Sequence, residues 1–142
     1  MAKMHTVPRP QIQGSSEHRN LKQLTKRFEY LGRKKVSKTD VTKRAYVLNQ
    51  VQKKVMDVAG RLPDSDRAFY IQNAVTLDKL KVTYYESKRQ QAGRKSEFRM
   101  GRELFDCVNV GDELLLATDG SEVFYYVAPF AGRDAPEKEL NM

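Results

Sequence analysis

A run of cations between positions 33 and 44 is the part of this sequence with the clearest chemical use. Arginine and lysine side chains neutralise phosphates without reading a base sequence, and each neutralised phosphate adds a salt-dependent share of affinity. A solvated helix face that only keeps a protein soluble has the same composition and is the alternative. We expect nucleic-acid contact from a first basic cluster that consists of Arg33, Lys34, Lys35, Lys38, Lys43 and Arg44.

A second group of cations lies between positions 88 and 102, shortly after a pair of tyrosines. Aromatic rings interleaved with cations can stack on bases, although aromatic residues at helical spacing more often belong to a core. The second basic cluster consists of Lys88, Arg89, Arg94, Lys95, Arg99 and Arg102, and we expect nucleic-acid contact above all from the first four. We expect contact with a partner from the aromatic residues Tyr84, Tyr85, Phe124 and Tyr126.

Charge is divided unevenly along the 142 residues. Residues 1–102 carry 24 basic and 9 acidic side chains, a net charge of +15, whereas residues 103–142 carry 2 basic and 9 acidic ones, a net charge of −7. The first part should therefore attract phosphate or an acidic protein, and the second part should repel both. A second interpretation is that the acidic end packs near the basic part and neutralises it.

Patterns that indicate catalysis or metal binding are few. The single cysteine, Cys107, excludes an internal disulfide, and His5 and His18 are too few for a zinc site made of cysteine and histidine. Neither histidine lies near a serine, a cysteine or a paired acid in a way that indicates a nucleophile and its base. We expect a protein that is not an enzyme and that uses no cofactor and no small-molecule substrate.

One acidic pattern has the spacing of the PD…(D/E)xK metal-dependent nucleases, in which Pro63-Asp64 is followed by Glu86-Ser87-Lys88. Those enzymes place two carboxylates on adjacent strands, where they share a divalent ion. If a helix runs from Asp64 through Glu86, its rise of 1.5 Å per residue separates the two carboxylates by about 33 Å. Such a separation excludes a shared ion.

The spacing of apolar side chains predicts the elements that carry these residues. Residues 1–14 contain two prolines and no apolar period, which predicts an extended arm. Apolar residues recur at helical spacing from about 16 to 31, and Gly32 favours the end of that helix. A second stripe from Val41 to Leu62 predicts a long helix with a helical-hairpin or coiled-coil seam that ends at Pro63.

A third helix is predicted over about 65–91, because apolar residues recur there at helical spacing around a wide arc. A short helix over about 96–105 follows. The period then changes to that of strands, and two predicted strands, 113–118 and 122–128, flank an Asp119-Gly120 turn. Residues 129–142 form an acidic tail.

Together these elements predict a mainly α protein, either a three-helix antiparallel bundle or a helical hairpin, with a short C-terminal β-hairpin. We expect an extended arm over 1–14, a single helical domain over 15–128 with the hairpin at about 113–128, and the acidic tail. No apolar run of about 18 residues and no signal peptide is visible, so we expect a cytoplasmic protein that does not cross a membrane.

Two segments resemble the Gre-type transcript-cleavage factors. The predicted helices on either side of Leu62-Pro63-Asp64-Ser65-Asp66 are similar to that family's coiled-coil arm, whose acidic tip binds a metal inside RNA polymerase. The segments Val110-Gly111-Asp112-Glu113-Leu114 and Gly120-Ser121-Glu122-Val123-Phe124-Tyr125 are similar to its last hairpin. The resemblance implies a polymerase-binding regulator with Asp64 and Asp66 at the metal-holding tip. Helix capping by these aspartates is the alternative.

Two functions from different classes follow from these observations. The first is a non-enzymatic accessory protein that binds DNA or RNA through the phosphate backbone, as a subunit of a larger nucleoprotein assembly. The second is a protein-interaction or assembly factor, for instance one encoded by a virus or phage, that binds an acidic partner protein. A Gre-like regulator belongs to this second class.

Overall fold

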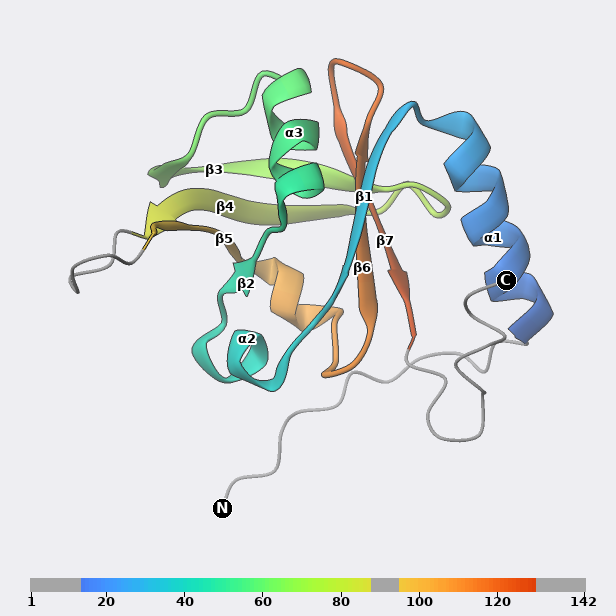
Figure 1. The fold of residues 1–142 in the computed structure, drawn as a ribbon, viewed down its shortest axis with the longest axis horizontal. Helices are drawn as coiled ribbons and strands as arrows, with labels where there is room; N and C mark the ends of the chain where they lie inside the picture. The colour runs from blue at the N-terminus through green and yellow to red at the C-terminus, as the bar shows by residue number, and fades with distance from the viewer. Residues whose placement is uncertain (1–13, 88–94, 130–142) are drawn as a thin grey trace.

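A curled seven-stranded mixed sheet dominates the molecule, so the prediction of a mainly α bundle is wrong (Figure 1). The structure is a computed structural model that describes residues 14–87 and 95–129. Its strands are β1 (Tyr30–Lys35), β2 (Tyr46–Val47), β3 (Asp64–Asn73), β4 (Lys79–Ser87), β5 (Glu97–Arg102), β6 (Glu113–Thr118) and β7 (Val123–Ala128). Its helices are α1 (Gly14–Arg27), α2 (Lys38–Lys43), α3 (Gln50–Val58) and the 3-10 turn η1 (Glu103–Asp106). The strand order is β1-β6-β7-β3-β4-β5-β2.

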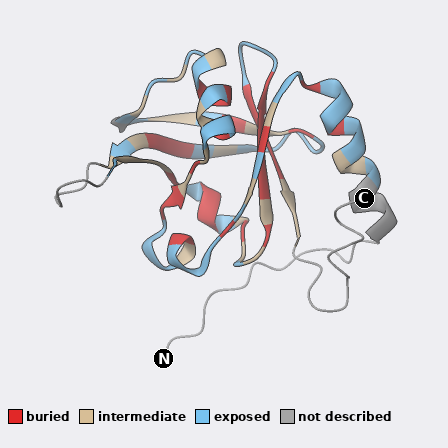
Figure 2. Ribbon diagram, in the orientation of Figure 1, coloured by how far each residue is buried: buried red, intermediate tan, exposed pale blue. Residues whose placement is uncertain are grey.

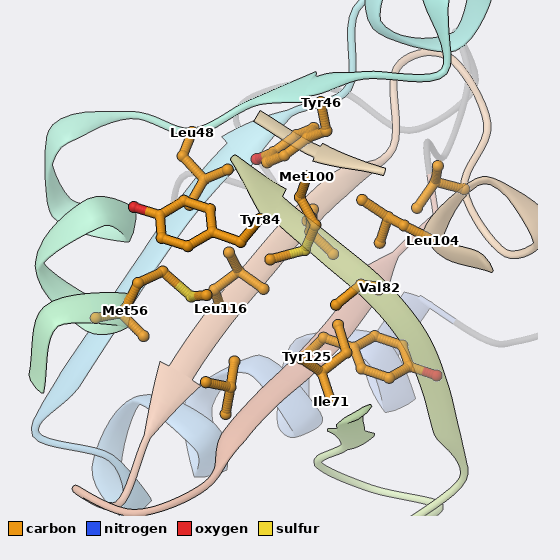
Figure 3. Packing of buried hydrophobic residues seen from close by; sticks show 14 of the residues in the cluster. Tyr46, Leu48, Met56, Ile71, Val82, Tyr84, Met100, Leu104, Leu116 and Tyr125 are labelled. Carbon is orange, nitrogen blue, oxygen red and sulfur yellow. The ribbon is translucent and has the colours of Figure 1, made fainter. Parts of the chain in front are cut away.

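The register of the strands decides which side chains share a face, because successive residues of a strand point to opposite sides. Neighbouring strands are antiparallel, except that β3 and β7 run parallel. One face, which includes Ile71, Val82 and Tyr84, forms the main core together with α3 and η1 (Figure 3). On the opposite face, α1 covers β6 and β7 through Leu24, together with Phe28 directly after the helix. Figure 2 shows how the buried residues concentrate on the strands.

Side chains bridge β1 and β2, the two ends of the strand order, and so close the curled sheet. The Lys34 ammonium on β1 donates to the Val47 carbonyl oxygen on β2 at 2.6 Å. The Asn49 side-chain amide donates to the Arg33 carbonyl oxygen at 2.9 Å, and the Tyr46 hydroxyl donates to the Lys34 carbonyl oxygen at 3.1 Å. We call this set of contacts the seam. It satisfies backbone groups that an open edge strand would present to another chain.

Helix α3 packs against the seam through Gln52, which is fully buried. The Gln52 amide nitrogen donates to the Tyr46 hydroxyl at 2.8 Å and to the Leu114 carbonyl oxygen at 3.1 Å, and its amide oxygen accepts from the Asn49 backbone N–H at 3.1 Å. Gly32 on β1 makes room for the helix, because a Cβ there would lie 2.9 Å from both the Cγ and the backbone nitrogen of Gln52. The approach of α3 to β1 therefore requires a glycine.

The predicted second helix is divided in two. Its first part, α2, ends at Arg44, whose backbone adopts the left-handed conformation with φ of 52°. The chain then pairs with β5 through β2. A new helix, α3, starts only after Asn49, whose side chain caps the backbone N–H of the third helical residue. The prediction of one continuous coiled-coil stripe from Val41 to Leu62 is therefore wrong, because β2 and the start of α3 interrupt it.

The predicted third helix is also wrong, since the described part of 65–91 belongs to the antiparallel strands β3 and β4. Phe69 and Ile71 face the core, whereas Tyr70 between them is exposed. The turn between the strands begins at Asn73, whose side-chain oxygen accepts from two backbone N–H groups at 2.8 and 2.9 Å. The segment predicted as a short helix over 96–105 forms β5 and η1 instead.

The C-terminal β-hairpin is confirmed, with β6 and β7 antiparallel along their whole length. Gly120 in its turn has φ of +99°, and the Asp119 carboxylate accepts from the backbone N–H groups of Ser121 and Glu122 at 2.9 and 2.8 Å. A helix also forms near the predicted first helix, although α1 ends at Arg27. Residues 1–13 of the predicted arm and 130–142 of the predicted tail lie outside the described residues.

The coiled-coil arm implied by the resemblance to Gre-type factors is wrong, because Asp64 and Asp66 lie on β3. Asp64 is not a helix cap either. Its carboxylate lies 3.8 Å from the Arg67 guanidinium. No helix within 14–87 and 95–129 combines the length and the apolar composition that crossing a membrane requires.

Candidate nucleic-acid interface

Lys34, at the centre of the first basic cluster, is engaged inside the molecule. Besides its hydrogen bond to Val47, its ammonium lies 3.7 Å from the Asp40 carboxylate and 4.6 Å from the centre of the Tyr46 ring. Its side chain is 31% exposed. Lys34 therefore stabilises the seam, and its charge is already matched within the fold.

Two arginines of the first basic cluster pair with carboxylates at the surface. Arg33 donates to Glu113 on β6 at 2.5 Å. Arg44 lies 3.8 Å from Asp106, and both of these side chains are more than half exposed. Exposed ion pairs stabilise a fold by only about 0–1 kcal/mol, so a phosphate can compete with the carboxylate for either arginine.

Among the remaining described cations of the two basic clusters, Arg99 is partly exposed and the others are exposed. Lys38 and Lys43 lie on α2, and neither forms an ion pair with a carboxylate of the described residues. Lys35 ends β1, and Lys95 precedes β5. Three predicted residues lie outside the described residues: Lys88, Arg89 and Arg94.

Burial separates the four aromatic residues that we expected at a partner surface. Tyr84 is 2% exposed in the main core, and this burial, with nearby carboxylates adding to it, raises its pKa to about 12. Phe124 and Tyr126 are each 6% exposed in the cluster beneath α1. These three side chains have almost no surface to offer a partner. Tyr85, the next residue of β4, points to the opposite side and is partly exposed.

A surface that sequence analysis did not predict lies on the outside of β3, β4 and β5. Helix α1 covers the outside of β6 and β7, whereas none of the described α-helices packs on the outside of these three strands (Figure 1). Cross-strand register places Tyr70 opposite Lys81 and Tyr85 opposite Arg99. The side chains that alternation along the strands brings to this surface, which we call the outer face, include Tyr70, Gln72, Lys79, Lys81, Thr83, Tyr85, Glu97 and Arg99.

The outer face presents two lysines whose charge no described carboxylate matches. Lys79 and Lys81 are exposed, and neither forms an ion pair within the described residues. Arg99, by contrast, donates to Glu97 at 2.6 and 3.1 Å. The Glu103 carboxylate, at the border, accepts from the Lys81 backbone N–H at 2.7 Å. The two acidic groups are thus held as acceptors, and the two lysine ammonium groups remain exposed to solvent.

Helix α2 ends beside the outer face. A Cβ added to Gly101 on β5 would lie 3.2 Å from the Arg44 carbonyl oxygen and 3.6 Å from the Thr83 hydroxyl. The backbone at Arg44 is therefore adjacent to the middle of the outer face, and Lys43 comes directly before it. Lys95 leads into β5 at the end of the face that carries Tyr85. The fold thus brings members of both predicted clusters to the border of the outer face, and Arg99 of the second cluster lies on the face itself.

The pairing of β3 and β4 also corrects the separation expected for the nuclease-like carboxylates. Asp64 pairs with Tyr84, and Glu86 follows two residues later on the same side of β4. Strand spacing and rise place the two acidic residues about 8 Å apart. The separation of about 33 Å that we expected for a helix is therefore wrong. The described residues nevertheless contain no group of three or more His, Cys, Asp or Glu side chains that could hold a metal ion.

Comparison with protein-family models finds no match, and neither does comparison with curated proteins. Among solved structures, the chain is similar to the crystal structure of the Arabidopsis thaliana transcription factor LEC2 in complex with DNA. The identity is 14% and the TM-score is 0.49, over 72% of this chain and 96% of that chain. We infer the function of this chain from its own residues.

Proposed function

We propose that this protein binds nucleic acid through its outer face, by contacts to the phosphate backbone and without catalysing a reaction. The observation that carries the proposal is the pair Lys79 and Lys81, two exposed ammonium groups on one side of a sheet that no described helix covers. Lysine binds phosphate as a point charge, and because the strand already fixes the backbone, only the freedom of the side chain is lost when the ammonium binds.

The neighbouring cations extend this surface. Lys43 and Arg44 border it from α2, and Lys95 borders it from β5. Arg33 and Arg44 contribute once a phosphate replaces their surface carboxylate partners, whereas Lys34 keeps its role in the seam. We therefore rank the outer-face lysines first, the α2 cations second and Lys34 last among the cations that contact phosphate.

Salt dependence provides the first test. The protein is titrated into labelled single-stranded and double-stranded DNA and RNA between about 50 and 200 mM salt, where each lost phosphate contact lowers the slope of log affinity against log salt by about 0.7–0.9. The variant Lys79→Glu/Lys81→Glu should bind weakly and show a slope smaller by about 1.4–1.8. The matched control, Lys26→Glu/Lys54→Glu, makes the same change of net charge on exposed positions of α1 and α3.

The possible outcomes of the titration distinguish binding through the outer face from binding through net charge and from no binding. A selective effect of the outer-face variant supports the proposal. Equal weakening by both variants would mean that net charge alone drives binding, and it would remove the outer face from the proposal. No binding at the lowest salt would overturn nucleic-acid binding, and a pull-down for an acidic partner protein would follow.

The same samples test the absence of catalysis. Oligonucleotides incubated with the protein and Mg²⁺ should stay intact on a denaturing gel, because the described residues offer no third ligand beside Asp64 and Glu86. Cleavage that EDTA and the variant Glu86→Gln both abolish would replace the binding proposal with a metal-dependent nuclease.

A further inference from the structure

We infer that the outer face takes single-stranded nucleic acid, with unpaired bases stacked on Tyr70 and Tyr85; this inference rests on the proposed function. Tyr70 is 54% exposed in the middle of β3, although the ring of a tyrosine on a folded sheet is ordinarily largely covered. Tyr85 is partly exposed on β4. An exposed aromatic ring on a rigid strand is a stacking platform for any base, because every base has a π-face.

Each ring has a cation directly beside it. Tyr70 pairs across the strands with Lys81, and Tyr85 pairs with Arg99. In antiparallel pairs the Cβ atoms of opposite residues lie about 4.5–5.5 Å apart, so a base on Tyr70 brings its own phosphate within reach of Lys81. A base on Tyr85 does the same for Arg99 once its phosphate replaces Glu97, the present partner of Arg99. Such alternation of rings and cations matches the alternation of bases and phosphates along one strand. Charge complementarity therefore favours a nucleic acid over an apolar partner at this surface.

The distance between the two rings distinguishes a single strand from a duplex. Lys81, opposite Tyr70, is four residues from Tyr85 along β4, so strand rise and spacing put the two tyrosines about 14 Å apart. Bases in a duplex stack at about 3.4 Å, and their faces are covered by their neighbours. Bases that rest on rings about four times farther apart must have left the stack, which a single strand allows at little cost.

A nearly buried threonine and a buried glycine lie between the two rings. Thr83 lies on the same side of β4 between Lys81 and Tyr85, and it is 7% exposed. Its neighbour on β5 is Gly101, which has no side chain to rise above the sheet. Because Thr83 is almost fully covered and a Cβ at Gly101 would lie 3.2 Å from the Arg44 carbonyl oxygen, these two residues add no contact of their own, and the inference rests on the two rings.

The test compares four oligonucleotides of about twelve units by fluorescence anisotropy at low salt. They are single-stranded DNA, single-stranded RNA, the DNA duplex, and an abasic strand that keeps the phosphates and sugars but lacks bases. Tyr70→Leu should weaken binding of both single strands by about 5- to 150-fold, the range expected for one lost stacking contact. It should leave the abasic strand unaffected. Tyr70→Phe, which keeps the ring, should bind single strands as the unaltered protein does.

Controls separate stacking from loss of the fold. Tyr30→Leu removes an exposed tyrosine of β1, outside the outer face, and should leave binding unchanged. Unchanged binding of the abasic strand by Tyr70→Leu shows that this variant is folded. Tyr85→Leu should repeat the pattern of Tyr70→Leu.

The outcomes distinguish the failure of this inference from the failure of the proposed function. If the outer-face lysine variant weakens binding while the abasic strand binds as tightly as a single strand, phosphate contact stands and base stacking is overturned. Tighter binding of the duplex than of either single strand would also overturn stacking and would leave the outer face as a duplex-binding surface. If no oligonucleotide binds, both proposals fall. A preference between the two single strands assigns the substrate as DNA or RNA.

Discussion

The substitution Gly32→Ala tests the closest approach between a helix and the sheet. A Cβ at position 32 would lie 2.9 Å from both the Cγ and the backbone nitrogen of Gln52, and 3.1 Å from the carbonyl carbon of Val51. Carbon atoms in good contact are about 3.5–4.0 Å apart, so α3 would have to move by roughly 0.5–1 Å. Two of the three atoms belong to the backbone of α3, so no rotation of a side chain relieves the contact.

The expected cost follows from that displacement. Overpacking a well-packed core costs about 1–3 kcal/mol, and moving α3 also disturbs the hydrogen bonds of Gln52 and the packing of Val55 and Met56. Replacing glycine by alanine recovers about 0.4–1 kcal/mol through the unfolded chain. We expect a net loss of about 2 kcal/mol, which lowers Tm by about 6–10 °C in a domain of this size.

Thermal and urea unfolding followed by circular dichroism measure this loss. Gly101→Ala is the matched control, because it makes the same substitution on a buried strand glycine with only one contact as close as 3.2 Å. It should cost clearly less than Gly32→Ala. Adding Gln52→Ala to Gly32→Ala should not restore stability, because the backbone contacts remain. A Tm within about 2 °C of the unaltered protein would refute the close packing of α3 on β1.

Three further predictions concern the seam and the hairpin turn. Gln52→Leu removes the amide that donates to the Tyr46 hydroxyl and to the Leu114 carbonyl oxygen in the core. It should destabilise the protein by about 2–3 kcal/mol, measured by urea unfolding. An unchanged urea midpoint would contradict the hydrogen-bond network at the seam. Gly120→Val forces a β-branched residue to φ near +99° and should cost about 1–3 kcal/mol, whereas equal thermal stability would contradict the turn. Backbone N–H groups of Glu122 and Ser121 hold the pKa of Asp119 below 3.8, so its stabilising contribution is complete above that pH and is lost as the pH falls through the lowered pKa. Asp119→Asn should therefore be less stable than the unaltered protein at neutral pH, and this difference should narrow as the pH falls through the lowered pKa; a difference in Tm that does not change with pH would contradict this.

The C-terminal hairpin could be predicted because its signals are local. Asp119-Gly120 supplies both a side-chain acceptor and a residue that tolerates positive φ, and the flanking residues belong to strands. The α-helical prediction for β3 and β4 failed because apolar residues over 65–91 fit more than one period. The run Lys-Leu-Lys-Val-Thr-Tyr-Tyr at 79–85 also alternates polar and apolar side chains, and this period is the one that pairing with β3 and β5 selects.

In the candidate site, too, local features could be predicted from the sequence, whereas contacts between distant residues could not. The basic residues were visible in the sequence as runs. Their partners are distant, because Arg33 pairs with Glu113, 80 positions away, and Lys34 donates a hydrogen bond to Val47 on β2. No local pattern reports such partners, so the sequence could not tell which cations are engaged. The sequence did not predict a role for Lys79 and Lys81, because they do not belong to a run of basic residues. Only the strand register places them together with Tyr70.

By itself, then, the sequence determined the properties that depend on composition and on a few neighbouring residues: the strongly basic first hundred residues, the acidic end, and the turn at Asp119-Gly120. Tertiary structure decided where the long helix breaks, which tyrosines are buried, and which lysines share an exposed face. The physical reason is that a strand obtains its hydrogen-bond partners from distant segments, so its periodicity has meaning only after the neighbours are in place. A helix, by contrast, forms its backbone hydrogen bonds within one segment. At 46–47 and 64–87, pairing with distant strands overrides the local preference for a helix.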